Sequence, residues 1–115
     1  MTVSAITLIV LRCADVERAR EFYEALGLTL VAEQHGARPR HYSTTIGRTV
    51  LELYPRGGSE TRGMRLGLSV SNLAGTLSAV ERIVGRAVRI EATPTPSAII
   101  EDPDGHTIEL TQALS

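Results

Sequence analysis

The sequence predicts an α+β fold built from two βαβββ modules within a single domain, residues 1–115. Strand-like apolar runs alternate with two segments of helical periodicity, and the same order of elements occurs twice. Corresponding landmarks in the two copies stand 57 residues apart, as Glu52 and Glu109 do, and as Asp15 and Asn72 do. At 115 residues, with 43% hydrophobic residues, the chain is long enough for one domain with a real core.

Module one is predicted over about residues 1–56. Its helix begins after Asp15, a good N-cap, and ends at Gly27, a common C-terminal stop. Its apolar residues recur at helical spacing between these two positions. A hairpin is predicted about Ile46-Gly47. The four strands of this module are predicted at 6–11, 28–33, 41–45 and 49–54.

Module two is predicted over about residues 64–115, after a polar, glycine-rich linker at about 55–63. Asn72 opens its helix and Gly85 closes it. Prolines at 94 and 96 interrupt the chain between its second and third strands. The four strands of this module are predicted at 64–70, 87–92, 97–101 and 106–112, the last two joined by a turn at 102–105.

The composition narrows the class of protein. A net charge of −1 gives no electrostatic reason to expect a nucleic-acid partner or an anionic membrane surface. The sequence holds no apolar stretch long enough to cross a bilayer, and its first residues lack a signal-peptide pattern. The lone cysteine, Cys13, cannot form an internal disulfide, which suits a reducing compartment. We therefore expect a cytoplasmic protein.

Three segments carry a resemblance to a known family. They are Asp15-Val16-Glu17-Arg18-Ala19-Arg20-Glu21-Phe22-Tyr23, Leu26-Gly27-Leu28, and Glu101-Asp102-Pro103-Asp104-Gly105-His106-Thr107-Ile108-Glu109-Leu110. With the repeated module they resemble the vicinal oxygen chelate superfamily, which includes glyoxalase I, extradiol dioxygenases and bleomycin-resistance proteins. The resemblance implies an open U-shaped mixed sheet around a cavity. It also implies modules that pair within or between chains, so we expect a homodimer.

In the metal-dependent members of that superfamily, four side chains at the cavity floor hold a divalent ion. The resemblance carries those positions onto Leu8, Glu52, Arg65 and Glu109. Leucine has no donor atom, and arginine is a permanent cation that does not ligate metals. We therefore expect no metal cofactor, with a divalent ion as the alternative. Arg65 is expected to neutralise Glu109, Glu52 or both, because two unpartnered buried carboxylates would repel each other.

One histidine is a candidate for restoring a nitrogen ligand. A two-residue turn at Ile46-Gly47 would place His41 opposite Glu52, and a metal site would then use Glu52, Glu109 and His41. A shift of one residue would place Tyr42 there instead and turn His41 to the other face of the strand. For all three histidines, a place on the surface or cavity rim is the simpler expectation. For Glu52 and Glu109 the simpler expectation is that both face solvent, as a glutamate in a strand usually does.

The residues leave three functional hypotheses. The first is a metal-independent small-molecule binder, of a sequestering or accessory kind, whose cavity includes Arg65, His41, Tyr42 and Leu8. Because the chain has only four aromatic residues, it should favour a small or aliphatic ligand over a large planar one. The second is a glyoxalase-like or epimerase-like lyase or isomerase with Glu52 or Glu109 as general base. The third is a protein with a closed cavity that acts through dimer contacts. Ring-opening dioxygenase activity ranks below all three.

Overall fold

The computed structural model describes residues 2–92 and 94–114. Module one contributes five elements: β1 (Leu8–Cys13), α1 (Val16–Ala25), β2 (Val31–Glu33), β3 (His41–Ile46) and β4 (Thr49–Pro55). Module two contributes four: β5 (Arg65–Val70), α2 (Leu73–Val84), β6 (Ser97–Glu101) and β7 (Thr107–Gln112). None of the described helices has the length and apolar character needed to cross a membrane.

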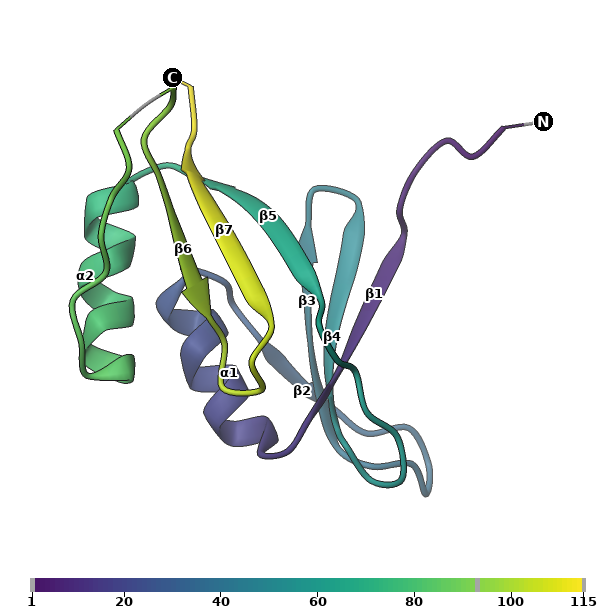
Figure 1. Ribbon diagram of the computed structural model, residues 1–115. Coiled ribbons are helices and arrows are strands. Elements are labelled where there is room, and N and C mark those ends of the chain that lie inside the picture. Colours follow the sequence, from purple (N-terminus) through teal and green to yellow (C-terminus); the bar gives the residue numbers. More distant parts are fainter. Residues whose placement is uncertain (1, 93, 115) are drawn as a thin grey trace.

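The strands form two open sheets of mixed direction, which confirms the α+β class. Sheet A has the order β1-β4-β3-β2, and sheet B has the order β5-β7-β6 (Figure 1). Both sheets are open, as expected, and in the described part of the chain they are separate from each other. Continuity would need the edge strands β1 and β5 to gain a second partner. Each has only one, β4 and β7 respectively.

The spacing of 57 residues between equivalent positions also holds for the strand pairs of the two sheets. Leu8 pairs with Val50 in the parallel ladder of sheet A, and Arg65 pairs with Thr107 in that of sheet B. The helix starts repeat at the same spacing, since the side chains of Asp15 and Asn72 accept hydrogen bonds from backbone amides of the first turns of α1 and α2. The two modules therefore share one frame for their first strand, their helix and their last strand.

The prediction of a strand at 87–92 is wrong. The described residues there form one isolated bridge, between Glu91 and Ser97. Part of the reason lies in Val88, whose amide donates to the Glu81 carboxylate of α2 at 2.6 Å and is thus not free for a strand ladder. Pro94 and Pro96 also lack the donors that a neighbouring strand needs. Module two therefore reads β-α-β-β, with three strands instead of four.

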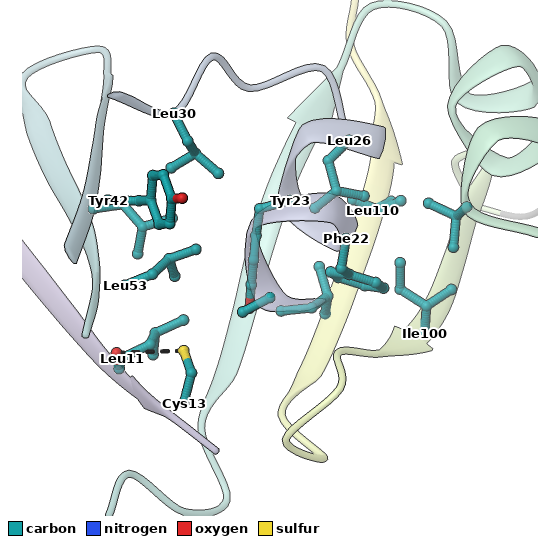
Figure 2. Packing of buried hydrophobic residues seen from close by; sticks show 14 of the residues in the cluster. Leu11, Cys13, Phe22, Tyr23, Leu26, Leu30, Tyr42, Leu53, Ile100 and Leu110 are labelled. Carbon is teal, nitrogen blue, oxygen red and sulfur yellow. Dashed lines mark hydrogen bonds between the residues drawn. The ribbon is translucent and has the colours of Figure 1, made fainter. Parts of the chain in front are cut away.

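The helices lie on the buried faces of both sheets. Helix α1 contacts β3 and β4, helix α2 contacts β7, and the two helices contact each other. Figure 2 shows Leu11 and Leu53 pointing from sheet A toward α1, while Phe22 on the far side of α1 points toward Ile100 of sheet B. All four side chains are buried. One core therefore runs from sheet A through the helices to sheet B, and it includes Phe22 and Tyr23 of α1.

Polar contacts also join the modules. The buried Tyr23 hydroxyl in α1 donates to the Asp102 carboxylate at 2.6 Å, and the amide of Ala14 donates to Asp104 at 2.8 Å. Asp102 also accepts from the amides of Asp104 and His106, which orders the turn between β6 and β7. Burial next to Asp102 raises the pKa of Tyr23 far above its ordinary value. The turn of module two is thus anchored on the helix of module one.

Candidate functional site

Each sheet has a second face that neither of the described helices covers, and we call these the open faces. The open face of sheet A carries eleven residues: Leu8, Val10, Arg12, Val31, Glu33, His41, Ser43, Thr45, Val50, Glu52 and Tyr54. The open face of sheet B carries nine: Arg65, Gly67, Ser69, Ser97, Ile99, Glu101, Thr107, Glu109 and Thr111. Because the buried faces turn toward the helices, the open faces turn outward. Glu52 and Glu109 therefore lie on different surfaces of one chain.

Glu52 lies in a shallow hollow of about 340 Å³ on the open face of sheet A. The hollow is lined by Val10, Arg12, Arg38, Pro39, Glu52 and Tyr54. The guanidinium of Arg12 lies over the Tyr54 ring, 4.9 Å from its centroid. The Glu52 side chain is 20% exposed, and its carboxylate stands 3.6 Å from Nε2 of His41. This half-buried acid therefore has access to solvent and a nitrogen neighbour.

The hairpin register differs from both predicted alternatives. Ile46 pairs with Thr49, so the turn consists of Gly47 and Arg48, with Gly47 at a φ of 60°. Ser43, and neither His41 nor Tyr42, is then opposite Glu52. A shift of two residues preserves the face of a strand, so His41 still lies on the same face as Glu52. Glycine at the first turn position meets the requirement for positive φ that Ile46 would have violated.

Tyr42 lies on the buried face, away from Glu52. Its side chain is buried, and its hydroxyl donates to the Glu17 carboxylate of α1. This hydrogen bond, with a further one from Arg20, lowers the pKa of Glu17, and the same bond raises the pKa of Tyr42. The prediction that Tyr42 would oppose Glu52 is wrong, because β3 has the register that turns Tyr42 toward the helix.

His41 and His106 are buried, so the expectation of surface or rim histidines is wrong for both. The His41 ring stacks on Tyr54, with centroids 4.1 Å apart and planes 9° apart. On module two, Nδ1 of His106 accepts from the amide of Met64 at 3.3 Å. His35 is exposed in the loop after β2, as expected. Stacking on Tyr54 covers the His41 ring, and His106 lies in the turn that Asp102 orders, contacts that single-sequence patterns do not report.

Glu109 lies in a hollow of about 320 Å³ on the open face of sheet B. Arg89, Glu91, Ser97, Ala98, Ile99 and Glu109 line this hollow, which shares no residue with the hollow around Glu52. Nη2 of Arg65 donates to the Glu109 carboxylate at 2.7 Å, which confirms the predicted ion pair for Glu109. The two side chains are 63% and 40% exposed, so in the single chain this pair is open to water.

The four positions implied by the resemblance do not fit a divalent ion. Leu8 offers no donor atom, and its side chain is exposed on the edge strand β1. Arg65 places a cation against Glu109, where the ion would have to bind. Glu52 lies on the other sheet. Two separated carboxylates, one of them already paired, give no closed set of ligands.

A third hollow lies between the buried faces and is apolar. It has a volume of about 330 Å³, and its lining includes Ile9 and Leu51 of sheet A and Leu66 and Leu68 of sheet B. Arg65 lies at its border. The hollow opens beside the unpaired edges β1 and β5, and thus marks the place where the single chain leaves its two sheets unjoined.

Cys13 is buried at the end of β1. Burial, with the nearby carboxylates of Asp104 and Asp102, raises the pKa of this thiol to about 12. Its sulfur lies 3.6 Å from the carbonyl oxygen of Leu11 (Figure 2). A thiol held protonated is a poor nucleophile and a poor metal ligand.

Glu33, which was not among the residues expected at the site, lies beside His41 in the structure. Glu33 pairs with His41 across β2 and β3, and its carboxylate stands 3.4 Å from Nε2 of that histidine. The signal was Glu33-Gln34-His35, whose alternation places residues 33 and 35 on one side of an extended chain. Using it required the register of β2 on β3, which the sequence does not determine.

Comparisons with known proteins agree with this architecture. A family model described as the Glyoxalase/Bleomycin resistance protein/Dioxygenase superfamily matches residues 5–110. No curated protein matches the sequence. Among solved structures, an antibiotic binding protein, TnmS3 from Streptomyces sp. CB03234, is similar with 27% identity and a TM-score of 0.73, over 99% of each chain.

Two further structures extend the range of similar proteins. A glyoxalase/bleomycin resistance protein from the same Streptomyces strain has 26% identity and a TM-score of 0.68, over 94% of this chain and all of the other. A lactoylglutathione lyase from Agrobacterium tumefaciens has 18% identity and a TM-score of 0.67, over 98% of this chain and 96% of the other. At that identity the lyase is evidence of shared fold alone.

Proposed function

The chain belongs to the glyoxalase/bleomycin resistance protein/dioxygenase superfamily, and we propose that it binds a small molecule without a metal at the four family positions. One observation carries the proposal. Arg65 occupies one of these positions and holds Glu109, a second, at 2.7 Å. Leu8 removes a third ligand. An ion-paired carboxylate is available neither to a cation nor as a strong base.

We propose that the protein is a homodimer. The open faces expose large apolar side chains, among them Leu8 and Val31 on sheet A and Ile99 on sheet B. Edge strands β1 and β5 each keep one unpaired side. A second chain that lays its sheet B over sheet A of the first would cover both features. It would also bring Glu52 of one chain near Glu109 of the other, which a single chain does not do.

The lining of the two hollows supports a ligand of modest size. Tyr54 is the only aromatic ring that lines the hollow around Glu52, and none lines that around Glu109. Arg12 and Arg38 supply positive charge near Glu52. A polar, partly aliphatic molecule suits this set better than a large planar one. The similarity to an antibiotic binding protein at 27% identity supports a sequestering or accessory role.

A thermal-shift screen tests the binding proposal. The panel consists of antibiotics and small polar metabolites, each measured in EDTA and again with added divalent ions. We expect stabilisation by at least one compound in EDTA, which Tyr54→Ala weakens by removing a wall of the hollow. Glu101→Gln, which lies on the open face of sheet B outside both hollows, is the control and should leave the shift unchanged. Stabilisation that appears only with added metal would contradict the proposal.

A second candidate is a cofactor-free lyase or isomerase that uses Glu52 as general base. The supporting observation is that Glu52, unlike Glu109, forms no ion pair with an arginine among the described residues. A carboxylate of this kind can remove a proton beside a carbonyl, and Arg12 in the same hollow could stabilise the resulting enolate charge. Exchange of substrate protons with deuterated solvent, lost in Glu52→Gln and retained in Glu109→Gln, would favour this candidate over the binder.

A further inference from the structure

We propose that the β2–β3 edge of sheet A holds a divalent transition-metal ion of the zinc type through Glu33, His35 and His41. One ligand atom from each of these residues lies within 4.8 Å of the others. None of the three is among the four family positions. The proposed ion site also does not depend on the small-molecule binding proposed above.

The orientation of His41 is the first argument. Its Nδ1 lies 3.3 Å from the carbonyl oxygen of Pro39, and a carbonyl can only accept, so Nδ1 carries a proton. Metal-binding histidines commonly donate their second ring N–H to such a carbonyl, which fixes the ring and directs the other nitrogen at the ion. Stacking on Tyr54 holds the ring in the same orientation.

The surroundings of Nε2 are the second argument. The His41 side chain is 0% exposed, and Nε2 has no hydrogen-bond partner among the described residues. It faces the carboxylates of Glu33 at 3.4 Å and Glu52 at 3.6 Å. A lone pair that faces two carboxylates is repulsive, and a cation among them would relieve that repulsion. Either a proton on Nε2 or a metal ion would supply that charge.

The distances and His35 favour the metal ion. Two ligands about 2.1 Å from a tetrahedral ion stand roughly 3.4 Å apart, which matches the separation of Nε2 and the Glu33 oxygen. The His35 ring centroid lies 5.6 Å from that of His41, so a second imidazole is within reach. Two imidazoles with carboxylate oxygen form a donor set that zinc, cobalt and nickel bind well. A shared proton would give His35 no role.

Module two lacks this arrangement, although its acids repeat. Glu91 bridges to Ser97 as Glu33 pairs with His41, and Glu109 stands at the position of Glu52. Serine takes the place of the buried histidine. Both acids of module two are matched by arginines, Arg89 with Glu91 at 3.2 Å and Arg65 with Glu109 at 2.7 Å. The acids of module one form no ion pair with an arginine among the described residues, which leaves their oxygens available to a metal ion.

Zinc titration of tag-free, EDTA-stripped protein tests this proposal. Calorimetry should give one zinc ion per chain, and cobalt should give the visible bands of a tetrahedral N/O site. His35→Ala changes an exposed side chain, so the fold should survive. It should weaken zinc binding by at least about tenfold, the lower end of the cost of losing even an outer partner of a metal site. Glu33→Gln should weaken it similarly.

Matched variants in module two serve as controls. Glu91→Gln removes the acid equivalent to Glu33, and Glu109→Gln removes a family position, and both should bind zinc like wild type. The proposal is overturned by a protein that binds no zinc in the titration, or by zinc binding that His35→Ala and Glu33→Gln leave unchanged. Zinc binding lost in Glu109→Gln would also overturn it, by placing the ion at the family site.

Discussion

Modules one and two have the same backbone frame, but different side chains lie beside the acids on their open faces. Glu52 and Glu109 occupy equivalent strand positions, next to Val10 in one ladder and Gly67 in the other. Glu109 is held by the exposed Arg65, whereas Glu52 lies beside the buried His41. The repeat thus keeps the position of an acid within this chain, while the side chain that accompanies the acid differs between the halves.

The hairpins of the two modules differ as well. The β3–β4 turn has two residues, Gly47 and Arg48, whereas the β6–β7 connection has five, 102–106. The longer connection carries Asp102, which Tyr23 of module one binds. Module two thus lacks the tight turn and the fourth strand of module one. Its longer connection instead supplies the contact with α1. Similar frames permit this because loops tolerate insertion at small cost in free energy.

The largest effects should come from the shared frame. Leu53 and Leu110 are equivalent, both are fully buried, and each lies on the last strand of its module. We expect Leu53→Ala and Leu110→Ala each to lower the free energy of unfolding by about 2–5 kcal/mol, because each leaves a cavity in one continuous core. Urea denaturation measures both. A cost near zero for either variant would show that its module is not part of that core.

The Tyr23–Asp102 hydrogen bond is a second difference between the modules, because only the helix of module one supplies its donor. The residue equivalent to Tyr23 in α2 is Val80, which has no hydroxyl to offer. Tyr23→Phe should cost roughly 1–3 kcal/mol, since a buried carboxylate oxygen loses its donor. Val80→Ala, a change at the equivalent position, serves as a packing control. Urea denaturation measures both variants, and a Tyr23→Phe protein as stable as wild type would show that this hydrogen bond does not contribute to stability.

The modules should also differ in how their stability depends on pH in the alkaline range. Cys13 has a raised pKa of about 12, and the residue equivalent to it in β5 is Val70, which does not titrate. The unfolded thiol loses its proton near its ordinary value of 9.0, while the folded one keeps it. The contribution of Cys13 is therefore fully present below that value and is lost as pH rises toward 12.

Urea midpoints across this alkaline window measure the effect. The midpoint of wild type should fall with pH, and that of Cys13→Ala should fall less steeply. Tyr23, whose pKa is also raised by burial, should leave a residual slope in the variant. Parallel curves for the two proteins would mean that the Cys13 thiolate costs nothing in the folded state.

Arg65 should give the smallest effect. The Arg65–Glu109 pair is exposed, so Arg65→Ala should cost at most about 1 kcal/mol in the monomeric state, in place of the larger loss expected for a buried pair. In a dimer that covers this face the cost should rise, and Glu109→Gln should restore part of it. An equal cost at dissociating and associating concentrations would show that the second chain does not cover Arg65.

Much of the frame could be predicted from the sequence because its signals are local. The caps Asp15 and Asn72, the helix stop Gly85, the parallel ladders and the Arg65–Glu109 pair follow from short motifs and the repeat. The burial of His41, the side of β3 that Tyr42 faces, and the missing strand at 87–92 depend on register and on tertiary competitors such as Glu81. A single sequence does not contain those contacts.

The central claim is that Glu52 and Glu109 share a cavity only between two chains. Chains carrying Glu52→Cys or Glu109→Cys, both with Cys13→Ala, can be co-expressed with different tags and treated with a short bismaleimide at tens of micromolar. We predict cross-links that join unlike chains, residue 52 of one to residue 109 of the other, in a protein that sediments as a dimer. A compact monomer, or cross-links that join only like chains, would contradict the account.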